Sequence, residues 1–461
     1  PQAHADEVLD IVAYAHDDRV ENEHGWTGEQ HPAHQAQAQH HVDVGQPLDA
    51  LVQPGIAGDR VADTHDGQNH ELPEKAFADT DQLMQAAVDL QHAQTQRCRH
   101  AHDCGHHRKD VDCVVHRRMA FLGQLAGQWG QTVNDRGESI ATKNSNPGLA
   151  TIFPGKYLGD LSLSNKYRNL FERVRLGEGY GTTWPIQGTP DLQGGRGLGR
   201  ADDRSLQRFT GACGQTVFRG DRLGDDMKGT YWVCEPVGRM IRCSDVEYDE
   251  GLITLHNRLE KQQLEFIAST DANFRPVNAY TAPDGTLHFI DMYRGIIQHG
   301  NWTREGSYLR SEILRRGLEK NVGKGRIYRL VREGIDPGPS PRFGKSDARE
   351  LVEALGHPNG WWRDEAQKLL VLRKDSKSIA LLRNAVTNAK SGFARAHALW
   401  TLDGMGVWDE SLVLHGISDK NVEVRLAALR VAGERILYHE ASDALLEAVS
   451  QSLPHRASSI S

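Results

Sequence analysis

The sequence lacks any long hydrophobic run, and this excludes a membrane-spanning helix. No stretch approaches the roughly 18 consecutive apolar residues that such a helix needs. Cysteine is also scarce, with 6 in 461 residues, which is too few for a fold held together by disulfides. Positive charge is not in excess, because 54 basic side chains stand against 62 acidic ones. We therefore do not expect a nucleic-acid-binding protein that depends on neutralising phosphates.

Aromatic residues and lysine are scarce in the first 140 residues, which are rich in His, Gln, Asp and Ala. Residues 1–116 hold 15 of the 23 histidines of the chain. Without sustained apolar patterning, burial scarcely offsets the entropy lost on ordering. We expect residues 1–140 to be a low-complexity tract that is disordered or weakly helical, although translation in another frame would give the same bias. No signal-peptide pattern follows Pro1, so a piece of a longer or misread reading frame is expected.

Thiol and imidazole side chains gather between Cys98 and His116, and zinc prefers such ligands. Their spacing, Cys98-x5-Cys104-x8-Cys113-x2-His116, matches no standard zinc site. Histidine is common throughout this tract, so compositional accident is the favoured interpretation and a metal site the alternative.

One pattern recurs between residues 145 and 335: a glycine, alternating large apolar residues, a polar or acidic residue, and a second apolar run. The copies are residues 159–171, 229–241 and 285–297, with Asn165, Glu235 and Asp291 at the polar position. Each copy is typical of a β-hairpin that cannot bury its faces alone. Regular recurrence predicts successive blades of a β-propeller, and a generic antiparallel sandwich is the alternative.

The period changes again after a proline-rich linker at residues 336–345. An Arg-x-x-Ala motif recurs in amphipathic runs at Arg363, Arg395 and Arg425, with spacings of 32 and 30 residues. Small alanines let paired helices approach, so residues 346–461 are expected to form an all-α solenoid of HEAT type. The expected fold class is thus mainly a partial β-propeller of three to four blades, at residues 145–335, followed by this solenoid.

Longer blocks carry a family resemblance, namely Tyr180–Gly195, Gly214–Asp221, Phe274–Trp302 and His357–Asp364. Over roughly residues 145–450 the chain resembles the large membrane-bound-dehydrogenase-type proteins of planctomycetes. The resemblance implies a propeller like that of glucose/sorbosone dehydrogenases, a HEAT solenoid, a periplasmic or otherwise extracytoplasmic location, and often a cytochrome c module. The chain contains no Cys-x-x-Cys-His motif, so haem c is expected only in a further C-terminal module.

The resemblance also implies a reaction: oxidation of a sugar or alcohol, with electrons passed to a pyrroloquinoline-type quinone or to haem, and with calcium. Such chemistry needs a base for the hydroxyl proton and cations for the quinone carboxylates. His299 is the predicted base, Asp291 the orienting or calcium-binding carboxylate, and Arg275 and Arg294 the predicted cofactor-binding cations. For Asp291 and Arg294 a structural alternative is favoured over the functional role, because the turn at Asn165 repeats theirs.

A non-catalytic scaffold is the alternative function, with propeller and solenoid surfaces that bind protein or polysaccharide. In the enzyme, a cytochrome or another protein would bind through the solenoid. Fold class alone does not decide between them, because propellers serve both functions. Other local patterns predict structure only: residues 321–330 read as a turn that enters a last strand, and Trp361–Trp362 as a plug where the solenoid begins.

Overall fold

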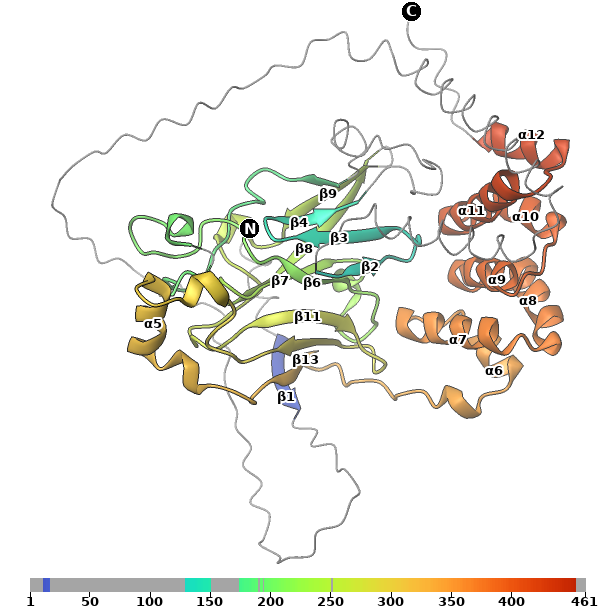
Figure 1. Cartoon of the computed structure of the whole chain (residues 1–461). Coiled ribbons are helices and arrows are strands. Elements are labelled where there is room, and N and C mark those ends of the chain that lie inside the picture. The colour runs from blue at the N-terminus through green and yellow to red at the C-terminus, as the bar shows by residue number, and fades with distance from the viewer. Residues whose placement is uncertain are drawn as a thin grey trace, which may run out of the picture. The chain divides into compact units, whose positions relative to one another are not determined.

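The computed structural model of the chain describes residues 11–16, 129–150, 174–189, 191–193, 195–249 and 252–452. Over these ranges, open β-sheets are followed by a helical region (Figure 1). The first copy of the repeat, at residues 159–171, lies outside the described residues. The Cys- and His-rich segment at residues 98–116 and most of the tract at residues 1–140 also lie outside them.

The described strands form sheets of three, six and four strands. The three-stranded sheet has the order β2-β3-β4, with β2 at Gln131–Val133, β3 at Ser139–Lys143 and β4 at Asn146–Leu149. The six-stranded sheet has the order β5-β9-β8-β7-β6, and its remaining strand, β10, pairs with β8. Its members are β5 Val174–Leu176, β6 Cys213–Val217, β7 Tyr231–Glu235, β8 Met240–Asp249, β9 Leu252–Asn257 and β10 Ile267–Ala268.

The four-stranded sheet joins residues that are far apart in the sequence. Its order is β1-β13-β12-β11, with β1 at Ile11–His16, β11 at Pro276–Thr281, β12 at Leu287–Asp291 and β13 at Arg326–Arg332. β1 runs antiparallel to β13, with Ile11 opposite Arg332 and His16 opposite Ile327. The tract at residues 1–140 therefore contains strands, β1 and β2, that its composition did not predict. β13 confirms the strand expected after residue 325.

The six-stranded sheet is the middle layer, and its strand β7 is buried on both faces. Trp232 and Cys234 belong to the core shared with the four-stranded sheet. Tyr231 and Val233 belong to the core shared with the three-stranded sheet. Because successive side chains on a strand point to opposite faces, one short apolar strand supplies both cores.

The propeller prediction is wrong, because the sheets of the described residues are open and none closes or is arranged as propeller blades. The repeated pattern does form a hairpin at Glu235, between β7 and β8. At Asp291 it forms one strand only, β12, and residues 292–299 then leave the sheet. Gly295 lies so close to the next segment that an added Cβ would be 2.4 Å from the Leu318 carbonyl oxygen. The pattern thus encodes a strand and its turn, and not the arrangement of the sheets.

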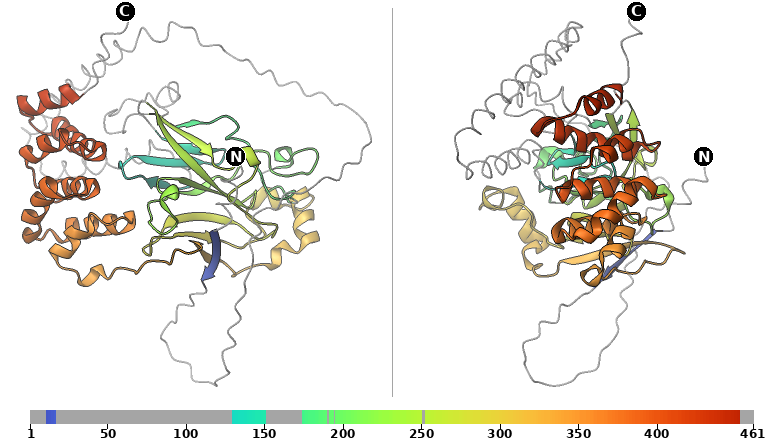
Figure 2. Two further views of the ribbon diagram at one scale, coloured as in Figure 1. Left: turned by 180° about the vertical axis from the view of Figure 1, so that it is seen from behind. Right: turned by 90° about the vertical axis from the view of Figure 1, so that its right-hand side faces the viewer.

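The residues after the linker form helices in two layers (Figure 2). One layer contains α7 Gly360–Arg373, α9 Gly392–Gly404 and α11 Val422–Tyr438, and the other contains α6 Ala348–Ala354, α8 Ser376–Asn388, α10 Glu410–Ile417 and α12 Asp443–Ser452. Five of these helices begin at a side-chain cap that accepts a backbone N–H of the first turn, namely Asp347, Asn359, Asp375, Ser391 and Asn421. The helices expected after residue 346 are therefore present.

Arg363, Arg395 and Arg425 occupy equivalent positions, as their spacing predicts. The Nη1 atom of each donates to the carbonyl oxygens six and five residues earlier in the chain. The two distances are 2.6 and 2.9 Å for Arg363 and 2.7 and 3.2 Å for Arg395. Each guanidinium thereby closes the loop that leads into its own helix.

Polar side chains join α7 to the sheets. Nη2 of Arg363 donates to Asp135 in the β2–β3 turn at 2.5 Å, and Asp135 also pairs with Arg219, which follows β6. Trp362 donates through Nε1 to the carbonyl oxygen of Pro283 in the β11–β12 turn at 2.7 Å. Trp362 therefore lies where the helices meet the sheets, as its position in the sequence predicts.

We expect Arg395→Met to destabilise the chain more than Arg425→Met. Arg395 also pairs with Asp419, through Nε at 2.7 Å and Nη2 at 2.9 Å, and their side chains are only 8% and 7% exposed. Breaking a buried ion pair costs about 3–5 kcal/mol, whereas losing hydrogen bonds to carbonyl groups costs about 1 kcal/mol each. Denaturant unfolding of the two variants measures the difference, and equal losses would contradict it.

Candidate functional site

The loops that carry the predicted site residues meet at one end of the two larger sheets. β7 ends and β8 begins at this end, and β12 ends where β13 and β11 begin, because these neighbours are antiparallel. The turn at residues 236–239 and the loops at residues 269–275 and 292–325 therefore lie together. The last loop contains α5 Tyr308–Arg316 and two short 3-10 helices, η7 Gly300–Thr303 and η8 Leu318–Lys320 (Figure 1).

Arg275, a predicted quinone-binding cation, is fully buried and donates only to the protein itself. Its Nη2 donates to the Asp191 carboxylate at 2.7 Å, and its Nη1 donates to the carbonyl oxygen of Pro236 at 2.7 Å. Nε donates to the carbonyl oxygen of Arg294 at 3.1 Å, and Nη2 also reaches that of Gly295 at 3.2 Å. Arg275 thus does bind a carboxylate, but the carboxylate belongs to this chain.

Asp191 lies buried between two guanidinium groups. One carboxylate oxygen accepts from Arg275, and the other accepts from Nη2 of Arg239 at 2.7 Å. Burial alone would raise the pKa of Asp191, but the two arginines outweigh it and lower the pKa from 3.8 to about 2. Burial, helped by the neighbouring charge of Arg239, lowers the pKa of Arg275 to about 10. Asp191 was not predicted as a site residue, because its partners are 48 and 84 residues away in the sequence.

Asp291 ends β12 and is fully buried. Its Oδ1 accepts the backbone N–H groups of Arg275 and Tyr293, each at 2.7 Å, while Oδ2 has no hydrogen-bond partner. Burial raises the pKa of Asp291, and the two N–H groups oppose this only in part. Glu235 likewise accepts the N–H of Val237, two residues onward, at 3.0 Å. The geometry therefore supports the structural alternative for Asp291, which is to cap a turn.

The side chains of Arg294 and His299 take no part in this buried network. Arg294 contributes its backbone carbonyl oxygen to Arg275, and its side chain is half-buried. His299 is exposed and precedes η7, and within the described ranges its ring has no hydrogen-bond partner. The structure thus brings Arg275 and Asp291 together and leaves His299 apart from their hydrogen bonds.

Two of the four predicted residues, Arg275 and Asp291, do not fit a quinone with calcium. All three guanidinium nitrogens of Arg275 donate hydrogen bonds to oxygens of this chain, so no pair of N–H groups is left to bind a quinone carboxylate. Asp291 has one free oxygen, whereas calcium takes 6–8 oxygen ligands. Across the part of the chain that the structure describes, no three His, Cys, Asp or Glu side chains form a group that could hold a metal ion.

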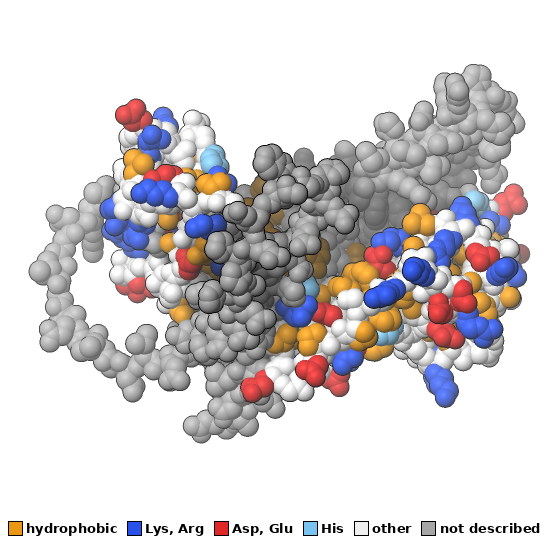
Figure 3. Space-filling view, turned by 90° about the horizontal axis from the view of Figure 1, so that it is seen from below, with side chains coloured by type: hydrophobic (Ala, Val, Ile, Leu, Met, Phe, Trp, Pro, Cys, Tyr) orange, Lys and Arg blue, Asp and Glu red, His pale blue; other side chains and the backbone are white. Residues whose placement is uncertain are grey.

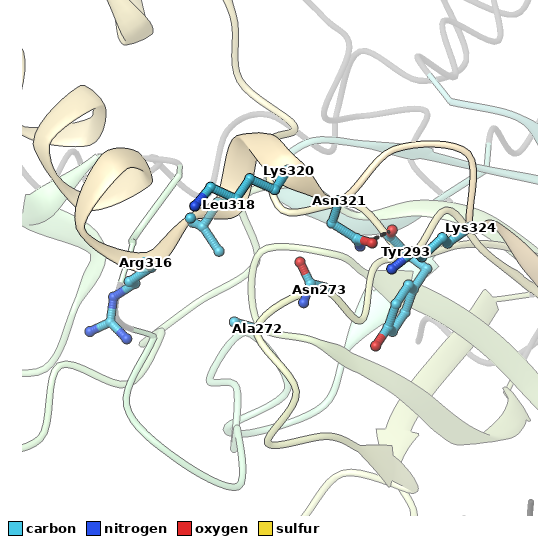
Figure 4. Close-up of a pocket in the computed structure, with 9 residues that line it drawn as sticks. Ala272, Asn273, Tyr293, Arg316, Leu318, Lys320, Asn321 and Lys324 are labelled. Atoms are coloured by element: carbon cyan, nitrogen blue, oxygen red, sulfur yellow. Dashed lines mark hydrogen bonds between the residues drawn. The ribbon is translucent and has the colours of Figure 1, made fainter.

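A different group of residues lines an open pocket of about 520 Å³ at this end of the sheets (Figure 4). It lies between the loop before β11, the turn after β12 and the segment from α5 to β13. The lining residues are Ala272, Asn273, Tyr293, Arg316, Gly317, Leu318, Lys320, Asn321 and Lys324. In the sequence, the cations of the pocket, Arg316, Lys320 and Lys324, are four residues apart. This regular spacing is the sequence signal of the pocket, but spacing alone does not predict a site.

The pocket is basic. Arg316 is partly neutralised by Glu312, whose Oε2 lies 3.1 Å from its Nε. Lys320 and Lys324 are exposed, and neither forms an ion pair with another described residue. Figure 3 shows further Lys and Arg side chains gathered on the side that carries α5. As far as the described residues go, the charges of these two lysines are not neutralised by a neighbouring carboxylate.

The fold and pocket define a protein with layered open sheets, a helical C-terminal region and a basic polar cavity. Residues 68–334 match the family model of a domain of unknown function, DUF7133. The match covers more than half of the chain, so the chain belongs to this family, and the matched domain ends just after β13. No curated protein matches the chain. None of the described helices is long and apolar enough to cross a membrane.

We expect the stability contributed by Asp191 to depend on pH. Its pKa is about 2 in the folded chain against an ordinary 3.8, so the unfolded chain takes up the proton first and stability falls as the pH drops through this window. The shift corresponds to about 2 kcal/mol. Denaturant unfolding should show that Asp191→Asn costs most near neutral pH and less near pH 3. A cost that does not change with pH would contradict this assignment.

Proposed function

We propose that this chain is a binding protein for an acidic saccharide, and that the basic pocket at residues 272–324 is its site. The observation that carries the proposal is the pocket's combination of amide side chains with two lysines that pair with no acidic group among the described residues. Its volume of about 520 Å³ is in the range of small-molecule sites, roughly 300–1,000 Å³.

The lining favours a hydrophilic anion over an apolar ligand. Ala272 and Leu318 are its only aliphatic side chains, and Leu318 is buried. Lysine ammonium groups bind carboxylate, sulfate or phosphate oxygens through charge-assisted hydrogen bonds. Asn273 and Asn321 line the pocket with amides, and Nδ2 of each already donates one hydrogen bond within the chain, to Asp271 and to the carbonyl oxygen of Tyr293. An amide retains a second N–H and an oxygen that can bond to hydroxyl groups. A hydroxyl-rich ring that carries an acidic group meets all of these requirements.

Binding explains the site better than catalysis does. Arg275 and Asp191 neutralise one another, and Asp291 holds a turn, so these groups are committed to the fold. The residues that remain available are cations and amides, which recognise a ligand without providing a base. This supports the non-catalytic alternative, with a saccharide as the ligand.

Oxidation of a sugar or alcohol by an extracytoplasmic enzyme is the second candidate. The exposed ring of His299, with no hydrogen-bond partner within the described ranges, is the observation that favours it. If the chain has this activity, His299→Gln should lower turnover by roughly 10²–10⁴-fold, because the amide cannot act as a base. The assay is sugar-dependent reduction of an artificial electron acceptor by the whole chain, with quinone and calcium supplied. Unchanged turnover would remove His299 from the reaction.

For the binding proposal, we expect the double variant Lys320→Gln/Lys324→Gln to bind trigalacturonate at least about tenfold more weakly than the parent chain, since two charge-assisted contacts are lost. The matched control is Lys377→Gln/Lys390→Gln, which removes two exposed charges from the helical region. Titration calorimetry at low and high salt measures both, and the parent affinity should fall with salt.

Neutral maltotriose distinguishes charge recognition from general sugar binding, because it offers hydroxyl groups and no carboxylate. We expect the parent chain to prefer trigalacturonate. If the parent binds neither probe, or if both double variants lose affinity equally, the proposed function is wrong.

A further inference from the structure

Tyr293, which lines the basic pocket, has a backbone conformation that tyrosine rarely adopts. Its φ is +44°, in the left-handed region that favours glycine. A bulky residue persists there only when its surroundings hold it, and such residues cluster at functional sites. Tyr293 must therefore be held in this conformation by its neighbours, and its side chain is a candidate functional group.

Side chains hold the Tyr293 backbone from both ends. Asp291 accepts its N–H at 2.7 Å, and Nδ2 of Asn321 donates to its carbonyl oxygen at 2.5 Å. Figure 4 shows Asn321 bonded to Tyr293 beside the pocket. The buried carboxylate that ends β12 thus fixes a residue of the pocket, although it does not line the pocket itself.

The capped turn does not require this conformation. In the equivalent turn after β7, Glu235 accepts the N–H of Val237 in the same way, at 3.0 Å. Val237 is not among the described residues with positive φ. In that turn the residue with positive φ is Arg239, at +59°, four residues after Glu235. The carboxylate cap therefore does not by itself place a left-handed residue two positions onward, where Tyr293 lies.

The Tyr293 ring is also held in place. The guanidinium of Arg326 lies over one face, 3.5 Å from the ring centroid. A hydrogen bond with Asp271 raises the pKa of the Tyr293 hydroxyl, so this group stays protonated at neutral pH. With one face covered by Arg326, only the opposite face of the ring is left for a ligand in the pocket.

We propose that Tyr293 is the platform against which a pyranose ring of the ligand packs, and that Asp291, Asn321 and Arg326 are positioning residues for it. This rests on the proposed saccharide binding and specifies it. The ligand carries its acidic group on a six-membered sugar ring, as a uronic acid does, so that the cations bind the acid while the tyrosine face packs against the ring C–H groups. A flexible anion without a ring, such as citrate, uses the cations alone.

The test compares Tyr293→Phe, Tyr293→Gly and the matched control Tyr280→Ala, which alters an exposed tyrosine on β11. Glycine adopts positive φ without strain, so Tyr293→Gly removes the ring without straining the backbone, and thermal unfolding checks that it is folded. We expect this variant to bind trigalacturonate at least about tenfold more weakly and to bind citrate as the parent does. Tyr293→Phe keeps the aromatic face and should bind trigalacturonate more tightly than Tyr293→Gly, whereas Tyr280→Ala leaves the pocket intact and should leave both affinities within about threefold.

The positioning role of Asp291 is tested by the ratio of the two affinities. Asp291→Ala removes the acceptor of the Tyr293 N–H and should reduce the preference for trigalacturonate over citrate, whereas Asp291→Asn keeps an acceptor and should restore it. A general loss of structure would lower both affinities together, and thermal unfolding of each variant shows whether it is folded.

The outcomes separate the two proposals. If the parent binds no acidic saccharide, the proposed function is wrong and this inference is overturned with it. If the parent binds trigalacturonate and Tyr293→Gly binds it equally well, the inference alone is overturned. A loss confined to the ring-bearing ligand supports it.

Discussion

The ion cluster of Asp191 with Arg239 and Arg275 is the interaction on which the site end of the molecule depends. One carboxylate and two guanidinium groups are removed from water there, with side-chain exposures of 3% or less. Hydrogen bonds to the remaining guanidinium donors help to offset the cost of burying such a cluster. Arg275 donates through all three of its nitrogens, whereas Arg239 donates through its two Nη atoms and its Nε has no hydrogen-bond partner among the described residues. The acceptors include backbone carbonyl oxygens of three loops, among them those of Pro236, Ala272 and Gly295. Segments without regular structure are thereby fixed to one another, and they form one side of the pocket.

The sequence predicted the local structure well, and it predicted the arrangement of the sheets poorly. Arg363, Arg395 and Arg425 could be assigned equivalent positions because the hydrogen bonds that they share, from Nη1, reach no further than six residues along the chain. The turns at Glu235 and Asp291 could likewise be recognised, because a carboxylate and the N–H two residues onward are local. How sheets pack depends on contacts between distant segments, and a repeated hairpin pattern carries no information about them. The propeller prediction was therefore wrong, although the turns at Glu235 and Asp291 on which it was based are present.

The candidate site shows the same division. Arg275 was predicted to bind a carboxylate of a quinone cofactor, and the carboxylate that it binds within the chain is Asp191, whose place in the fold its neighbours in the sequence do not indicate. Conversely, the pocket cations were visible as a spacing of four residues in the sequence. Their role in a pocket is evident only from the fold, because α5 and η8 bring them to the same pocket as Asn273, which lies in the loop before β11. The sequence thus shows which side chains are charged. Whether a charged side chain can bind a ligand depends on the neighbours that the fold places around it.

The pairing of β1 with β13 has a consequence for how the chain is made. β1 leaves the ribosome more than 300 residues before β13, the strand it pairs with, so it has no hydrogen-bonding partner in this sheet until β13 has been made. Contacts of such sequence separation form slowly, and unpaired strand edges invite association with other chains. Since β13 lies between β1 and β12, the four-stranded sheet is assembled only after the last of its strands in the sequence leaves the ribosome.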